Sequence, residues 1–187
     1  MKQGGGKAKG AEFERQVCKS LSKWISGVRR DDLLWRSAMS GGRATLGLKE
    51  GVRRLAQSGD ISAIGLEAHQ LISVYSIECK FVKDLNIQGL VYGTKSGLID
   101  HWGQACCEAS SVGKLPMLVA KQNHKPPIVG LSRASYRDGG GPVRRRGLAQ
   151  MREARLLVCP HEDLNVMFFN DMLNLPPEYL LWEYVGS

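Results

Sequence analysis

Two short strings of residues contain acidic side chains and a lysine at positions where a buried strand usually has apolar side chains. They read SGDI at residues 58–61 and IECK at residues 77–80. Successive side chains of a strand alternate between its faces, so Glu78 and Lys80 point the same way while the cysteine between them points into the opposite packing layer. A hairpin turn between the strings would bring Asp60 next to Glu78. Two carboxylates and an ammonium on one face of a sheet suit a hard cation and a phosphate.

The chemistry that such a set favours is phosphodiester hydrolysis. That reaction needs a water that is nucleophilic near neutral pH and relief of charge on the phosphate and the leaving oxygen. Mg²⁺ or Mn²⁺ bound by a few carboxylates does both and keeps several of its own waters. We expect Asp60 and Glu78 to bind the metal, and Lys80 to orient or deprotonate the attacking water and stabilise the phosphate. A backbone carbonyl, that of Cys79 or of a neighbour, is expected to complete the metal shell.

Positive charge is concentrated before the C-terminal segment. The chain has 187 residues, enough for one domain with a core of its own. All 26 lysines and arginines lie at or before Arg155, and residues 1–155 hold 13 acidic residues, which leaves this part with a net charge of +13. A basic surface of that size favours a polyanion as partner, most simply nucleic acid. A soluble basic protein without such a partner is the alternative.

The sequence gives no sign of a membrane partner or of secretion. It has no run of eighteen apolar residues, and its start, MKQGGGKAKG, has no apolar core. The five cysteines form no C-x-x-C pair, which is typical of reduced core residues in an intracellular protein. We therefore expect a cytoplasmic protein with a flexible basic arm at residues 1–10 and a single domain at residues 11–187.

Apolar patterning predicts the elements that must position these side chains. Phe13, Val17, Leu21 and Trp24 recur at helical spacing and predict a helix over residues 12–25. A β-branched run predicts a central strand, and shorter apolar runs predict further elements. The central strand is expected at residues 71–82, other strands at residues 33–39, 60–66, 116–121, 128–132 and 156–159, and helices at residues 99–112 and 176–184.

Glycine, arginine and proline mark the connections between these elements. Residues 40–58 and 84–97 are expected to be irregular, and residues 133–150 to form a mobile basic insertion. The order of helix, three strands, helix and two strands predicts an α/β layer built on a mixed sheet. It is not the strict alternation of a dinucleotide-binding fold.

Asp60, the interval of seventeen residues and the triplet Glu78-Cys79-Lys80 together resemble the motif of PD-(D/E)XK nucleases. Gly59 stands where that family usually has proline. The resemblance extends over about residues 9–132 and implies a restriction-endonuclease-like core, a central mixed β-sheet flanked by helices. It also implies a divalent metal as cofactor and DNA as partner.

The opening helix carries a second resemblance. Residues 9–15, KGAEFER, are similar to the K-G-x-x-x-E-R start of Holliday-junction resolvases within this superfamily. In those enzymes a helix glutamate completes the metal site, and Glu14 takes that position here. Glu12 lies on a different face of the helix and is the weaker candidate. A solvated acid in the first turns of the helix is the alternative for Glu14.

Residues 35–42, WRSAMSGG, resemble the R-x-x-x-S-G-G segment that precedes the first acid in phage-type nucleases. A Ser-Gly-Gly turn lets backbone amides approach a phosphate closely. The resemblance implies a protein that a phage encodes in its bacterial host; an ordinary glycine turn is the alternative. The DNA contacts that it implies are Arg36, Ser40, Gly41, Gly42 and Arg43.

Two elements after the motif strand match the continuation of the superfamily. A helix that carries a glutamine is common there, with the glutamine near metal or DNA, and Gln104 takes this place. Lys121 ends the next strand and would contact the DNA backbone or be solvated. Three arginines of the basic insertion, Arg144, Arg145 and Arg146, would suit phosphate contacts, which set affinity rather than sequence preference.

These features favour a metal-dependent DNA endonuclease that is structure-selective, like the junction resolvases. Such enzymes act as symmetric homodimers, because two related strands must be cut. A nicking or restriction-type nuclease on ordinary duplex is the first alternative. A non-catalytic DNA-binding module on the same fold is the second, although a binding protein has no reason to collect carboxylates beside phosphates.

Overall fold

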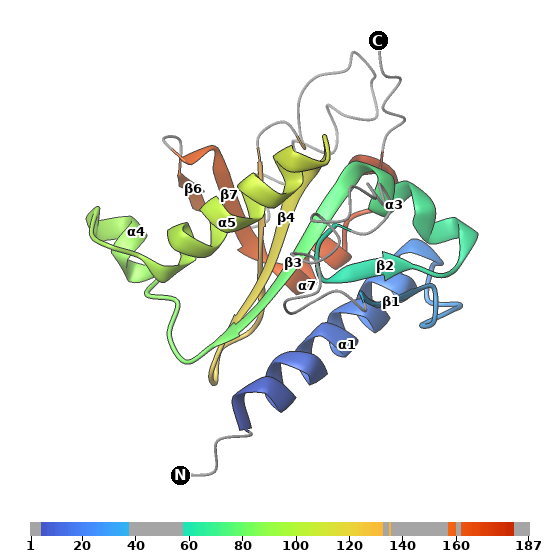
Figure 1. Ribbon diagram of the computed structural model, residues 1–187, viewed down its shortest axis with the longest axis horizontal. Coiled ribbons are helices and arrows are strands. Elements are labelled where there is room, and N and C mark those ends of the chain that lie inside the picture. The colour runs from blue at the N-terminus through green and yellow to red at the C-terminus, as the bar shows by residue number, and fades with distance from the viewer. Residues whose placement is uncertain (1–4, 38–57, 133–134, 136–156, 160–161, 182–187) are drawn as a thin grey trace, which may run out of the picture.

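The computed structural model describes residues 5–37, 58–132, 135, 157–159 and 162–181. Its centre is a five-stranded sheet in the order β3-β4-β5-β7-β6. β3 and β4 are parallel and the other pairs are antiparallel, so the sheet is mixed (Figure 1). The strands are β3 (Tyr75–Val82), β4 (Leu115–Gln122), β5 (Ile128–Leu131), β6 (Leu157–Cys159) and β7 (Leu164–Phe168).

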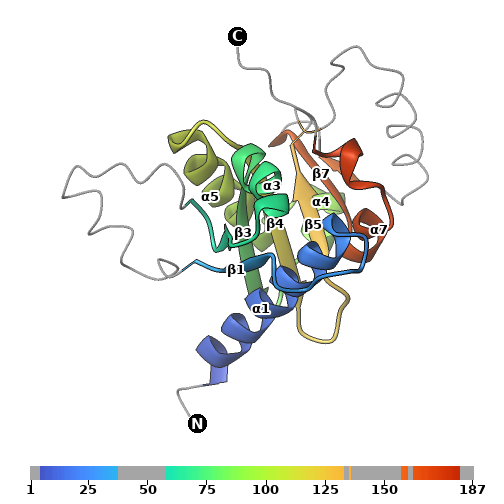
Figure 2. The ribbon, with the colours of Figure 1, turned by 90° about the vertical axis from the view of Figure 1, so that its right-hand side faces the viewer.

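Two long helices cover opposite faces of this sheet (Figures 1 and 2). α1 (Gly5–Ile25) packs in one core with Met117 and Val119 of β4. α5 (Gly97–Ser111) packs in a second core with Leu118 and Ala120 of the same strand. The alternation along β4 assigns each core to one face of the sheet. The expected α/β fold, a mixed sheet flanked by helices, is confirmed.

The apolar stripe predicted for the first helix is buried. Phe13, Val17, Leu21 and Trp24 all lie in the first core, and Trp24 Nε1 donates a hydrogen bond of 2.6 Å to the Leu175 carbonyl oxygen. The helix starts seven residues earlier than the stripe predicts, at Gly5. Residues 5–10, which were expected to form a flexible arm, are therefore helical. The helix continues on the N-terminal side of Phe13, its first buried apolar side chain.

A small antiparallel sheet of β1 (Leu34–Arg36) and β2 (Ile61–Ala63) lies beside the open edge of β3. η1 (Leu66–Ala68) and α3 (His69–Val74) then lead into β3. The predicted central strand is thus too long at its start: Leu71–Val74 is helical. Three of its side chains are buried in the first core, and this packing overrides the strand propensity of the run.

The expected hairpin between the two motif strings is wrong. Gly59 pairs with Ile77 in a parallel bridge, so the chain crosses over through β2 and α3 before it enters β3. Parallel neighbours cannot be joined by a tight turn and need a crossover that usually contains a helix. The crossover still brings the two strings side by side, as predicted.

The remaining segments differ from expectation in detail. α4 (Gln88–Tyr92) forms within the stretch predicted to be irregular, and α7 (Phe169–Leu173) follows β7 directly. The expected closing helix is the short η4 (Pro177–Tyr179), and the basic insertion falls almost entirely outside the described residues. Within the described part of the chain, the longest helices are too polar or too short to cross a bilayer.

Candidate active site

Asp60 lies at the open edge of β3, held from both sides by backbone hydrogen bonds. Its N–H donates to the Ile77 carbonyl oxygen at 2.8 Å, and its own carbonyl oxygen accepts from the Ser37 N–H at 2.7 Å. Its side-chain Oδ2 accepts from the Cys79 N–H at 2.9 Å. These bonds fix the carboxylate against the middle of the motif strand.

The glycine before Asp60 makes this approach possible. Gly59 has a φ of +80°, and a Cβ placed there would lie 2.5 Å from the Ile77 carbonyl oxygen. Glycine alone combines an easy positive φ with the absence of a Cβ. Proline, with φ fixed near −65°, cannot adopt this conformation. The departure from the family's usual proline therefore has a local structural cause.

Glu78 and Lys80 share one face of β3, as the period of the strand predicts. Lys80 Nζ lies 2.5 Å from Glu78 Oε1, and the Glu78 side chain is 7% exposed. Cys79 points to the opposite face, where it is buried in the first core with Ile77. The predicted alternation is confirmed.

The carboxyl groups at this edge resist ionisation. Burial raises the pKa of Glu78 to about 7, the charge of Asp60 adds to the rise, and the hydrogen bond and charge of Lys80 oppose it. Burial also raises the pKa of Asp60, against the hydrogen bond from the Cys79 N–H, and the charge of Glu14 raises it further. Buried carboxylates that repel one another are the oxygen ligands that a divalent cation stabilises. The chemistry of the pair thus fits Mg²⁺ or Mn²⁺.

Lys80 has the opposite tendency. Burial lowers its pKa, but the hydrogen bond and the charge of Glu78 outweigh burial and raise the pKa above its ordinary value. Its ammonium group therefore stays protonated at neutral pH, with a side chain that is 23% exposed. It can donate hydrogen bonds to an anion at the edge of the sheet.

The Cys79 carbonyl oxygen also faces this edge. The N–H and C=O of one strand residue point to the same side, and the Cys79 N–H points to Asp60. The carbonyl is thus placed on the side of the Asp60 carboxylate, which is where a backbone ligand would be needed.

Glu14 reaches the same region from α1, on the other side of the sheet. Its carboxylate forms an ion pair with Arg36 Nε, and the two side chains are 14% and 29% exposed. Its charge contributes to the raised pKa of Asp60, so the two carboxylates are neighbours. Glu12 is exposed and pairs with Arg15 instead. Arg36, expected at DNA, is engaged with Glu14.

The described acidic side chains at this edge do not form a shell of ligands for a metal ion. Among the described residues, no three His, Cys, Asp or Glu side chains converge closely enough to hold a metal ion. Glu14 and Glu78 are instead bound to Arg36 and Lys80. Two cationic side chains thus neutralise the carboxylates that were predicted to bind metal.

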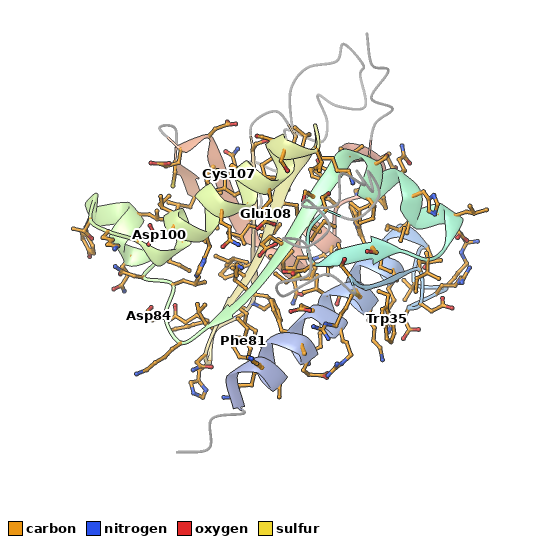
Figure 3. All side chains as sticks on the ribbon, viewed as in Figure 1. Trp35, Phe81, Asp84, Asp100, Cys107 and Glu108 are labelled. Atoms are coloured by element: carbon orange, nitrogen blue, oxygen red, sulfur yellow. The ribbon has the colours of Figure 1, made fainter. Side chains whose placement is uncertain are left out.

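Helix α5 adds Glu108, which the sequence analysis missed. Glu108 Oε1 accepts a hydrogen bond of 3.0 Å from Gln104 Nε2, and its charge raises the pKa of Asp60, Glu78 and Lys80. Burial and the charge of Lys80 lower the pKa of His101. Figure 3 shows Glu108 where α5 passes beside β3. The spacing of residues 101, 104 and 108 along one helix face is the signal that could have found Glu108.

The other predicted DNA contacts are dispersed. Lys121 lies on the α1 face of the sheet, with its Nζ 5.6 Å from the centre of the Phe81 ring, whereas Gln104 lies on the α5 side. Trp102 is buried, and its Nε1 donates to the Glu162 carbonyl oxygen at 2.8 Å. Ser40, Gly41, Gly42, Arg43, Arg144, Arg145 and Arg146 fall outside the described residues.

Comparison with known proteins identifies the family. A model of the family described as "Phage putative PDDEXK endonuclease" matches residues 5–139, which is more than half of the chain and includes both motif strings. No curated protein and no solved structure matches the chain. The match spans α1, the Asp60 edge, the motif strand and α5. The chain therefore belongs to this phage family of PD-(D/E)XK endonucleases.

Proposed function

We propose that this protein is a divalent-metal-dependent DNA endonuclease that hydrolyses phosphodiester bonds. The observation that carries the proposal is the pair of largely buried carboxyl groups, Asp60 and Glu78, at one strand edge beside Lys80. Burial and mutual repulsion raise both pKa values, which disfavours the ionised pair unless a cation binds. Family membership supports DNA as the substrate.

Asp60, Glu78 and the Cys79 carbonyl would hold Mg²⁺ or Mn²⁺. Glu14 would join them once its carboxylate leaves Arg36. When bound, the ion would supply an activated water and charge stabilisation at the phosphate.

The chain's own contribution is orientation and charge. The three hydrogen bonds of Asp60 hold its carboxylate at the edge of β3 without further reorganisation. Lys80 carries a protonated ammonium, which suits donation to a phosphate oxygen and orientation of the attacking water rather than removal of its proton in this state. Arg36 would exchange Glu14 for a phosphate as DNA enters.

We propose branched DNA as the preferred substrate and a homodimer as the active form. Both rest on the similarity of residues 9–15 to the helix start of junction resolvases. Basic residues on several segments would bind the phosphate backbone and set affinity rather than sequence preference. These contacts are Arg36, Ser40, Gly41, Gly42, Arg43, Gln104, Lys121, Arg144, Arg145 and Arg146. Cleavage of four-way junctions, flaps and linear duplex at equal concentration tests the preference, and equal rates on all three would favour a duplex nuclease.

Isosteric replacement of the two carboxylates tests the endonuclease itself. Asp60→Asn and Glu78→Gln should abolish Mg²⁺-dependent cutting and leave DNA binding within about threefold, because the amide keeps the shape and removes the charge. Asp31→Asn changes an exposed aspartate and is the matched control. Undiminished cleavage by both site variants would refute the assignment.

A further inference from the structure

A second feature lies directly beside the proposed nuclease site, on the α1 side of the sheet. It is a cavity of about 300 Å³ between the first half of α1 and the ends of β3 and β4. It is lined by Ala8, Lys9, Glu12, Phe13, Gln16, Phe81 and Lys121, which we call the α1–β3 pocket. None of the roles proposed above uses it, apart from a backbone contact for Lys121.

Two residues of the pocket are neighbours of proposed catalytic residues in the sequence. Phe13 immediately precedes Glu14 on α1, and Phe81 immediately follows Lys80 on β3. The two rings contact each other, with centroids 5.8 Å apart and planes at 48°. Figure 3 shows Phe81 at the end of β3 beside α1. Lys80 and Phe81 point to opposite faces of β3, which is the end strand of the five-stranded sheet, so a DNA strand with a phosphate at Lys80 would reach this pocket by passing around the edge of β3.

The chemistry of the lining suits a group that is flat, partly apolar and attached to an anion. The half-buried Phe81 ring packs against the buried Phe13, and aromatic side chains are the surfaces on which nucleobases stack. Lys9 and Lys121 carry ammonium groups at the same cavity, and Lys121 Nζ lies 5.6 Å from the Phe81 ring centre. Phosphates attract such ammonium groups irrespective of base sequence.

The single acid of the lining does not cancel this attraction. Glu12 Oε2 pairs with Arg15 at 2.7 Å, and Gln16 Nε2 lies 3.5 Å from its other oxygen. Arg15 holds the pKa of Glu12 below its ordinary value, so Glu12 is ionised and already paired. Among the residues that the structure describes, neither Lys9 nor Lys121 forms an ion pair, so their ammonium groups can bind the phosphate of a nucleotide.

The α1–β3 pocket has a volume of about 300 Å³ and opens to solvent between exposed side chains of α1. It is at the lower end of the range for small-ligand sites, which suits one nucleotide rather than two paired ones. We propose that the α1–β3 pocket binds one unpaired nucleotide that flanks the phosphate to be cut. This proposal rests on the proposed endonuclease function and deepens it, because it gives a physical reason for preferring DNA with unpaired positions.

The test compares two DNA probes in EDTA, so that no strand is cut. One probe is a fluorescein-labelled duplex with a single unpaired 5-iodouracil, and the other is the same duplex with that base paired. We expect fluorescence anisotropy to give at least about tenfold tighter binding to the unpaired probe, as one stacked base contributes. Ultraviolet cross-linking followed by mass spectrometry should place the iodouracil on Phe81, the half-buried ring of the pocket.

Matched variants assign that preference to the pocket. Phe81→Leu and Lys121→Gln should each remove most of the tenfold preference. Phe168→Leu, at an exposed phenylalanine of β7, and Lys23→Gln, at an exposed lysine of α1, should keep it. Lys121→Gln changes a partly exposed side chain, so it still tests the pocket if Phe81→Leu fails to fold.

Two results would overturn the proposal: equal affinity of the wild-type protein for both probes, or an unchanged preference in both pocket variants. Cross-links confined to residues outside the pocket would do the same. Cleavage is measured separately with Mg²⁺ and the Asp60→Asn variant. If the wild-type protein cuts no DNA but its preference depends on Phe81, the pocket is supported and the nuclease function is refuted. If the protein cuts DNA but shows no preference that depends on Phe81, the nuclease function is supported and the pocket is refuted.

Discussion

The carboxylate of Asp60 accepts a hydrogen bond of 2.9 Å from the backbone N–H of Cys79. This bond joins the two motif strings through the centre of the E-x-K triplet, between Glu78 and Lys80. It also forces the chain before Asp60 to run beside Ile77 in a parallel bridge. The position of the first acid relative to the second is thus set by the backbone of β3 rather than by a flexible loop.

We expect Gly59 to be the position in this arrangement at which a substitution lowers stability most. Gly59→Ala introduces a Cβ at 2.5 Å from the Ile77 carbonyl oxygen at a φ of +80°. A strained φ alone costs roughly 1–3 kcal/mol, and the contact with fixed backbone adds to it. At about 2–4 °C per kcal/mol for a chain of this size, the strained φ alone lowers the Tm by about 2–12 °C, and we expect the contact to make the fall larger, as measured by circular dichroism.

Gly113→Ala separates the two causes of that loss. Gly113 has a φ of +69°, but a Cβ there would have no heavy atom within 4 Å. This control should therefore show the cost of the positive φ without the contact. Equal losses of Tm in the two variants would mean that the backbone around Ile77 moves aside.

The face on which each motif residue lies could be predicted from the sequence, because the period of two in a strand leaves no choice once the strand is identified. The apolar stripes of α1 and α5 are predictable for the same reason. The start of β3 is not: Leu71–Val74 has the composition of a strand, but burial of its side chains on a helix decides its conformation.

Contacts between side chains that are far apart in the chain could not be predicted from the sequence either. The ion pair of Glu14 with Arg36 depends on how α1 packs beside β1, and the orientation of Glu108 depends on the rotation of α5 over β3. Spacing along the chain gives neither quantity. The residues of the E-x-K edge, Lys80 included, and the shared helix face of Gln104 and Glu108 are thus predictable. The pairing of Glu14 with Arg36 and the approach of α5 to this edge come from packing.

The raised pKa of Glu78 predicts a pH-dependent stability in the absence of metal. The folded-state pKa of about 7 lies above the ordinary value of 4.5, so the folded state binds more protons between these values. The stability contributed by the neutral form is complete below about pH 4.5 and is lost as the pH rises through 7. Glu78→Gln removes this titration.

The measurement is chemical denaturation in EDTA at pH 4.5, 6 and 8. We expect the free energy of unfolding of Glu78→Gln, relative to that of the wild type, to increase by roughly 1–3 kcal/mol between pH 4.5 and 8, because only the wild type loses this stability as the pH rises. Glu67→Gln, at an exposed glutamate of η1, should show no such trend. A parallel pH dependence in Glu78→Gln and wild type would show that Glu78 ionises normally.

Divalent cations should stabilise the folded protein through the same carboxylates. A ligand that binds only the folded state at 100 times its Kd adds about 2.7 kcal/mol, or about 5–10 °C in Tm for a chain of this size. We expect Mn²⁺ to raise the Tm by that order at pH 8, and Asp60→Asn to abolish most of the rise. A Tm that Mn²⁺ leaves unchanged in the wild-type protein would contradict Asp60 and Glu78 as metal ligands.

Arg36 should oppose metal binding, because it occupies the carboxylate of Glu14. The pair is largely buried, so Arg36→Gln leaves a shielded carboxylate without its cation and should cost roughly 1–3 kcal/mol of stability in EDTA. The same variant frees Glu14 for a metal. Its Tm should therefore rise more with Mn²⁺ than that of the wild-type protein, while its affinity for DNA falls.

Arg30→Gln is the matched control, because it breaks an exposed pair with Asp32 at 2.9 Å. Exposed pairs contribute about 0–1 kcal/mol, and Arg30 pairs with Asp32 and Glu67, neither of which belongs to the proposed site. It should change neither the Mn²⁺-dependent Tm shift nor DNA affinity. If Arg36→Gln and Glu14→Gln respond to Mn²⁺ alike, Glu14 is not a metal ligand, and the ion pair serves only to fix α1 against β1.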